Sequence, residues 1–202
     1  MTEATRPPGR PRSETTRQAV LESAARLLDT QSYRDISIER IASEAKVGKQ
    51  SIYRWWDGKA DVLLEAFTDR ALKQLPVPAS TGDAPRDLEM LLRAFFVNVR
   101  EPTITKTLTG LIAESQVDPD FRAKFYETFI SRRRTMMRDL IQAGIANGQF
   151  RTGLDVELTL DIIYGTFWYR LLSGTAAPLD DTFAATLVRT LHPVLTGVTA
   201  KS

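Results

Sequence analysis

Apolar residues recur every three or four positions along most of the chain, and no stretch shows the strict alternation of a half-buried strand. The pattern therefore predicts an all-α protein of about nine helices. The expected helices cover residues 16–29, 38–45, 49–56, 58–75, 85–100, 102–116, 119–146, 156–173 and 182–195. Between the fourth and fifth helices, the segment 76–85 (PVPASTGDAP) has a linker-like composition, so we expect two domains.

Residues that cap helices mark several of these limits. Ser37 and Asp155 precede the second and eighth expected helices, and their side-chain oxygens can accept a hydrogen bond from a free backbone N–H. By the same argument, Ser13 or the threonines that follow it cap the first helix, and Asp57 caps the fourth. Pro85 suits the first position of the fifth helix, because its φ is already helical and it has no N–H to leave unpaired.

Two short helices, expected at 38–45 and 49–56, follow each other in the arrangement of a helix-turn-helix. In such a unit the second helix lays its first residues in the major groove of DNA. The segment KQSIYRWW, which begins at Lys49, keeps two apolar side chains inward and presents polar ones outward. Gln50 can bond adenine through two hydrogen bonds, and Lys49 can donate to guanine or phosphate.

Basic residues are concentrated near the N-terminus. The formal net charge is only +2, but residues 1–60 hold 11 Lys and Arg against 8 Asp and Glu, whereas the rest of the chain holds 16 against 17. Residues 6–12 (RPPGRPR) form a basic, proline-stiffened segment before the first helix. Arginines in an extended segment fit the narrow minor groove of DNA, as in an AT-hook. A solubilising tail is the alternative interpretation.

The composition excludes several classes of enzyme site. Without cysteine the chain has no thiol nucleophile and no Cys-ligated metal, and its single histidine, His192, cannot build a histidine metal cluster. We expect no catalytic residue, no metal and no cofactor. The sequence also has no apolar run as long as a membrane span and no apolar signal region, so we expect a cytoplasmic protein without a membrane partner. An all-α enzyme and a helical protein-binding adaptor remain the competing classes.

Residues 17–67 resemble the N-terminal DNA-binding domain of the TetR family of transcriptional regulators. The marks of this resemblance are Ile36-Ser37-Ile38, Ile41-Ala42, Ile52-Tyr53, Trp55-Trp56 and Lys59. It implies an N-terminal three-helix helix-turn-helix domain followed by a C-terminal helical bundle for ligand binding and dimerisation. The expected parts are a basic flexible arm at 1–13, a helix-turn-helix DNA-binding domain at 14–58, a connecting helix at 59–75 and a ligand-binding and dimerisation domain at 83–202.

The resemblance further implies a ligand-responsive repressor. Such a protein binds a pseudo-palindromic operator in double-stranded DNA as a homodimer, and a small apolar or aromatic effector releases it. The residues expected to contact DNA are Arg10, Arg12, Ser37, Lys46, Gly48, Lys49, Gln50, Ser51, Tyr53, Arg54, Trp55 and Lys59. Three of them depart from the family pattern: Lys46 replaces a common glycine of the turn, Gly48 a capping Ser or Thr, and Trp55 a histidine.

An effector cavity is implied among the fifth to eighth helices. Its candidate lining residues are Phe96, Leu108, Ile112, Phe125, Phe129, Met136, Met137, Tyr164 and Trp168. These are large apolar or aromatic side chains, and methionine adapts to irregular cavities. For any one of them a place in the ordinary core is the simpler interpretation, since large apolar side chains are interior by default.

The last two helices are the candidates for a dimer interface. Residues 164–172 are apolar on nearly all sides, so this helix must be covered on more than one face. A four-helix contact around a two-fold axis would cover it, and the alternative is that both helices are interior to a monomer. The candidate interface residues are Tyr164, Phe167, Leu171, Phe183, Leu187, Leu191 and Leu195.

Overall fold

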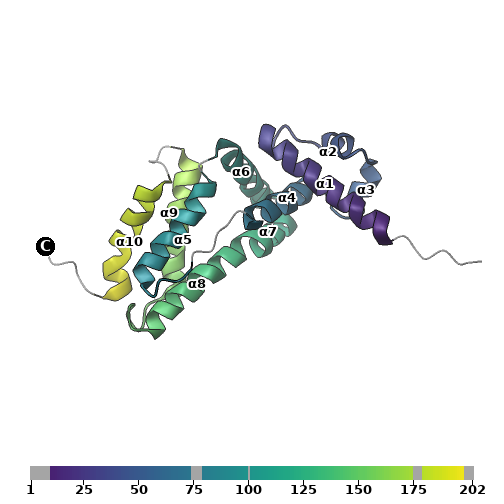
Figure 1. Ribbon diagram of the computed structural model, residues 1–202. Coiled ribbons are helices and arrows are strands. Elements are labelled where there is room, and N and C mark those ends of the chain that lie inside the picture. The colour runs from purple at the N-terminus through teal and green to yellow at the C-terminus, as the bar shows by residue number, and fades with distance from the viewer. Residues whose placement is uncertain (1–9, 74–78, 100, 175–178, 198–202) are drawn as a thin grey trace, which may run out of the picture. The chain divides into compact units, whose positions relative to one another are not determined.

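The computed structural model describes residues 10–73, 79–99, 101–174 and 179–197, with side chains described except at 10–13, 71–73 and 98. Every regular element in these ranges is a helix (Figure 1), which confirms the all-α prediction. The chain divides into two compact units, residues 1–70 and residues 71–202. The division falls within the helix expected to connect two domains, and the finer domain limits given above stay predictions.

The first unit contains three helices and most of a fourth. They are α1 (Arg10–Thr30), α2 (Ile38–Ala45), α3 (Lys49–Tyr53) and α4 (Lys59–Lys73). Helix α1 packs against both α2 and α3. The side chains of Val20, Ile41 and Ile52 are fully buried in this unit, and Trp56 is buried just beyond α3.

Helix α1 begins at Arg10, so the last part of the segment expected as a flexible arm has a helical backbone. Ser13 and the two threonines that follow it therefore lie inside the helix and do not cap it. Pro11 does not oppose this start, because proline is tolerated in the first turn, where its missing N–H would have no partner.

The third and fourth helices are also shorter than expected. Helix α3 ends at Tyr53, where the backbone turns and the N–H groups of Trp55 and Trp56 both donate to the carbonyl of Ile52. Helix α4 begins at Lys59, so Asp57 is not its N-cap. Instead, the carboxylate of Asp61, in the first turn of α4, accepts a hydrogen bond from the backbone N–H of Asp57 at 3.1 Å.

The second unit is a bundle of longer helices. They are α5 (Ala84–Asn98), α6 (Pro102–Val117), α7 (Pro119–Phe125), the π-helical η1 (Tyr126–Ile130), α8 (Ser131–Ala146), α9 (Val156–Ser173) and α10 (Asp181–Thr196). Because α7, η1 and α8 follow one another without a break, they form the single long helix expected at 119–146. Counted in this way, the described residues hold the nine predicted helices.

Helix caps in the second unit follow a common pattern. Asp118, Asp155 and Asp180 each accept a hydrogen bond from a backbone N–H in the first turn of the next helix. Asp83 does the same for α5, accepting from Arg86 N at 3.0 Å. This cap starts α5 one residue earlier than expected and makes Pro85 its second residue.

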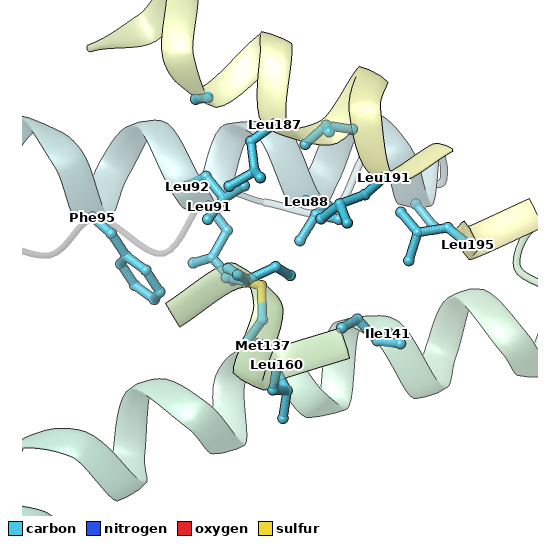
Figure 2. Close-up of a cluster of buried hydrophobic side chains, with 14 of the residues drawn as sticks. Leu88, Leu91, Leu92, Phe95, Met137, Ile141, Leu160, Leu187, Leu191 and Leu195 are labelled. Atoms are coloured by element: carbon cyan, nitrogen blue, oxygen red, sulfur yellow. The ribbon is translucent and has the colours of Figure 1, made fainter. Parts of the chain in front are cut away.

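The core of the second unit forms where α5 packs between α8 and α10. Figure 2 shows leucines of α5 meeting Met137 and Ile141 of α8 and the leucines of α10, with Leu160 of α9 beside them. Near the other end of α5, the ring of Phe96 stacks on Phe183, with centroids 5.4 Å apart. Side chains from four helices thus close one apolar core.

Gly144 marks a close approach in this core. The buried ring of Phe150 folds back onto the glycine, and a Cβ at residue 144 would overlap the ring and lie 3.0 Å from the Cβ of Ala84. The carbonyl of Gly144 also accepts from the backbone N–H of Phe150 at 2.9 Å. The turn after α8 therefore needs a residue without a side chain at this position.

We predict that Gly144→Ala lowers the free energy of unfolding by about 1 to 3 kcal/mol, because overpacking outweighs the gain in helix propensity. Urea denaturation measures the change. In a Phe150→Leu background, where the ring is gone, the same substitution costs less. If Gly144→Ala costs as much in the Phe150→Leu background as in the wild-type protein, or if it stabilises the wild-type protein, the ring moves aside freely.

Candidate DNA-binding site and effector domain

The turn between α2 and α3 is built from local backbone requirements. Ser37 caps α2 by accepting from Arg40 N at 3.2 Å, as predicted. Lys46 then ends α2 in the left-handed region with φ of 56°, the only positive φ among the described residues that are not glycine. A side chain in this region costs roughly 1–2 kcal/mol, which explains why glycine suits the turn better. Gly48 takes the N-cap position of α3 with extended backbone and no side-chain bond.

Helix α3 separates an inner from an outer face. Ile52 is fully buried and Trp56 nearly so. On the outer side Lys49, Gln50, Arg54 and Tyr53 are exposed, and Tyr53 exposes 55% of its surface. Ser51 is half-buried, and Trp55 exposes 41%. Most of the residues that the sequence assigned to DNA in this segment are thus exposed, while its two apolar anchors are buried.

Lys49 is already paired in the free chain. Its Nζ lies 3.0 Å from a carboxylate oxygen of Glu39 in α2. This hydrogen bond and the opposite charges raise the pKa of Lys49 and lower the pKa of Glu39. Because both side chains are exposed, the pair is weak in water and Lys49 can exchange Glu39 for a phosphate or base.

The two tryptophans after α3 are held by a charged pair from other helices. The indole N–H of Trp56 donates to Glu65 of α4 at 2.7 Å, and the other oxygen of Glu65 binds the guanidinium of Arg17 from α1. Arg17 also lies 5.6 Å from the ring centroid of Trp55 and 5.8 Å from that of Trp56. Sequence reasoning missed Arg17 and Glu65, because 48 positions separate them and neither belongs to a motif.

Lys59 binds backbone carbonyls in the free chain. Its Nζ donates to the backbone carbonyls of Tyr33, Arg34 and Ile36, at 3.1, 3.4 and 3.0 Å, and lies 4.7 Å from the ring centroid of Tyr33. An ammonium group has three N–H donors, so these acceptors can use all of them. Lys59 therefore secures the loop that leads into α2. The side chains of Arg10 and Arg12, also expected at DNA, lie outside the described residues.

Both parts of the chain match known families. Residues 20–66 match bacterial regulatory proteins of the tetR family, and residues 78–191 match the tetracyclin repressor-like C-terminal domain. The chain belongs to the TetR family of transcriptional regulators.

Individual TetR-family members are similar over most of their length. The transcriptional regulator YdeS of Bacillus subtilis is 36% identical over 182 residues, which cover 89% of each chain. The crystal structure of the TetR-family regulator SCO0332 superposes with a TM-score of 0.75 at 30% identity and covers 92% of this chain and 99% of that one. FadR of Bacillus subtilis, solved in complex with stearoyl-CoA, shares the fold with a TM-score of 0.61 at 18% identity, over 90% and 99% of the two chains. The first two relatives are named as regulators of transcription and not as enzymes.

In the TetR-family C-terminal domain, most predicted pocket residues pack in the interior of the chain. Phe96, Leu108, Phe125, Phe129 and Met137 are buried, and the other four are partly buried. Phe125 and Phe129 stack along the long helix with centroids 5.4 Å apart.

Two hollows are described in this domain. One, of about 360 Å³, lies between the start of α5 and α8 and includes Met136; the other, of about 460 Å³, lies beside Arg86 and Val188. Of the predicted pocket residues, Met136 alone lines one of these two hollows.

The predicted dimer stripe on α10 is also interior. Phe183, Leu187, Leu191 and Leu195 are buried in the core of their own chain, so they offer no free face to a partner. On α9, Tyr164 and Phe167 pack partly against the same core, and Leu171 is partly buried.

The exposed apolar residues of α9 lie on another side of the helix. They are Leu158, Ile162, Tyr169 and Leu172, with exposed Gly165 between them. Their spacing of four, three, four and three residues places them along one face. The sequence could not identify this face, because α9 is apolar nearly all round.

Within the described residues, no helix is long and apolar enough to span a membrane. The same residues contain no group of three or more His, Asp and Glu side chains placed to hold a metal ion.

We predict that Glu65→Ala lowers the free energy of unfolding by about 1 to 3 kcal/mol, because the substitution leaves the buried indole N–H of Trp56 without an acceptor. Urea denaturation followed by tryptophan fluorescence measures the stability. Glu22→Ala, which removes an exposed glutamate of α1, serves as the control and should change stability by less than about 0.5 kcal/mol. Equal losses in the two variants would contradict a specific role for Glu65.

Proposed function

We propose that this TetR-family regulator is a repressor that binds a two-fold symmetric operator as a homodimer and leaves it when a small effector binds the second unit. The observation that carries the DNA-binding part is the division of α3 into a buried inner face and an exposed polar outer face. A helix fixed by Ile52 and Trp56 presents Lys49, Gln50 and Tyr53 in a constant geometry. Base recognition needs such a geometry, because hydrogen bonds to base edges are directional.

Separate roles follow for the residues assigned to DNA. Gln50 and Lys49 read base edges, while Ser51, Tyr53, Arg54 and Trp55 contact the backbone or the margins of the groove. The phosphate contacts at the start of the motif come from Ser37, Lys46 and the backbone at Gly48. Arg10 and Arg12 also contact DNA, and a minor-groove contact requires the start of α1 to unwind, because their backbone is helical in the free chain. Lys59 acts by holding the loop before α2 in place and not through phosphate, since three carbonyls already engage its Nζ.

The homodimer is supported by the exposed face of α9. Four large apolar side chains and an open glycine form a self-complementary strip of the kind that two-fold interfaces bury. Nothing in the described part of the chain lies within 4 Å of a Cβ built at Gly165, so a second helix can approach closely there. This face replaces the α10 stripe, whose leucines are already buried in the monomer.

Release by an effector requires that the ligand favour one spacing of the two α3 helices over another. FadR, which shares the fold of this chain, was crystallised in complex with stearoyl-CoA, and this supports a small-molecule ligand for a protein of this fold. The repressor assignment is supported by the match of residues 78–191 to a tetracyclin repressor-like domain.

We predict that selection from a random DNA pool by the full chain enriches an inverted repeat with half-site centres one helical turn apart, about 34 to 36 Å. On that operator, Gln50→Ala lowers affinity by about 5- to 150-fold, the loss of a bidentate base contact worth about 1–3 kcal/mol. Fluorescence anisotropy measures the affinity, and non-specific DNA binding should stay the same. Gln142→Ala, at an exposed position of α8, is the control. Unchanged operator affinity in Gln50→Ala would remove α3 from base recognition.

We predict that Ile162→Glu converts the dimer to a monomer, because a carboxylate in an apolar interface loses its hydration. Ile162 exposes 40% of its surface, so the substitution leaves the monomer fold intact. Analytical ultracentrifugation gives the mass, and circular dichroism checks the fold. The matched control is Val117→Glu on α6, where the valine exposes 78% of its surface and the dimer should persist. A dimeric Ile162→Glu protein would place the interface elsewhere.

A further inference from the structure

Arg133 of α8 carries a partly buried guanidinium without an acidic partner. Its Nη1 donates to the carbonyl of Phe129 at 3.1 Å, and the guanidinium lies 3.8 Å from the centroid of the Phe129 ring. In the described part of the chain no Asp or Glu pairs with it, and burial lowers the pKa of Arg133 to about 10. The side chain therefore stays positive at neutral pH with most of its N–H donors unused.

Arg133 has no acidic partner although acidic residues lie nearby, as the pairs of the neighbouring arginines show. Arg134 binds Glu157 at 2.8 Å and Asp161 at 2.7 Å, and Arg138 binds Glu157 at 2.7 Å. These bonds lower the pKa of Glu157 to about 2. The acids of α9 are thus used by its neighbours. A buried charge without a counter-charge is costly, so proteins pair such groups with residues or with ligands.

Tyr164 of α9 supplies a second unpaired donor beside Arg133. Its hydroxyl is buried and has no hydrogen-bond partner among the described residues. The pairs of Arg138 with Glu157 and of Arg134 with Asp161 show that α8 and α9 run antiparallel, and they place Tyr164 about level with Ser131, two residues before Arg133. Burial raises the pKa of Tyr164, and the charge of Arg133 opposes that rise.

The surroundings of these two donors suit a ligand. The π-helical segment η1 ends at Ile130, shortly before Arg133, and π turns are frequent at functional sites. Phe129 and Trp168, close to the two donors along their helices, supply apolar surface.

We propose that Arg133 and Tyr164 form the polar end of the effector site and that the effector is an apolar carboxylic acid. Its carboxylate accepts two hydrogen bonds from the guanidinium fork and one from the tyrosine hydroxyl, which supplies the missing counter-charge. Its apolar body lies against aromatic side chains. This inference rests on the proposed effector-controlled repressor. It adds that the effector carries an acidic group.

Pairs of acids and alcohols with the same body test the inference. The probes are octanoate and 1-octanol, benzoate and benzyl alcohol, and 2-naphthoate and 2-naphthalenemethanol, with binding to the full chain measured by calorimetry. We expect at least one acid to bind at least tenfold more tightly than its alcohol, and Arg133→Met to lose this preference. Arg132→Met, at the exposed neighbouring arginine, keeps it. The inference is overturned if no acid exceeds its alcohol, or if Arg133→Met retains the preference.

A measurement without ligand separates a binding arginine from a structural one. Met keeps an unbranched side chain at this position but removes the guanidinium and its unpaired charge, so Arg133→Met should raise the melting temperature of the free protein. Arg134→Met, which breaks two ion pairs, should lower it. A loss of stability in Arg133→Met as large as in Arg134→Met would make Arg133 structural and overturn the inference.

Operator release distinguishes this inference from the proposed function. If an acid binds through Arg133 but does not release the operator, the acid site stands and the effector-controlled repressor fails. If the protein binds its operator as a dimer while none of the acids exceeds its alcohol, the repressor stands and the acid site fails.

Discussion

A helix of five residues has no stability of its own in water, so α3 exists only because its inner face is packed. Ile52 fills the core between α1 and α2, and Trp56 closes it beyond the end of the helix. The indole N–H of Trp56 would be a buried donor without a partner if Glu65 did not accept its hydrogen bond. Arg17 in turn neutralises Glu65. The direction in which α3 presents its polar side chains therefore depends on one tryptophan and the charged pair behind it.

The sequence predicts the local parts of this arrangement well, because local rules govern them. Ser37 caps α2 and Gly48 begins α3 as expected, since capping depends on residues only a few positions apart. The contacts that hold Trp56 connect three helices, and no pattern within one helix reveals them. Lys59 illustrates the difference: its identity and position are predictable, but its three carbonyl partners depend on the path of the loop before α2.

The same limit applies in the second unit. Leu187 and Leu191 form a regular apolar stripe, and a stripe that fits a partner chain is indistinguishable in sequence from one that fits the neighbouring helix α5. Helix α9 is apolar on all sides, so its periodicity does not identify the face left over after packing. That face, along Ile162 and Tyr169, becomes visible only once the core is assembled.

Arg133 and Arg134 are adjacent in sequence, yet they point in different directions and differ in what balances their charge. Arg134 reaches acids on the surface of α9, whereas Arg133 turns inward, where the chain offers it one carbonyl and an aromatic ring. Tyr164, whose hydroxyl feels the charge of Arg133, belongs to the same helix as Ile162 of the proposed dimer face. A ligand that drew Tyr164 and Arg133 together would move α9 against α8 and carry that face with it. In the proposed homodimer, a ligand at Arg133 would therefore act on the α9 face that joins the two copies and would need no change within the helix-turn-helix itself.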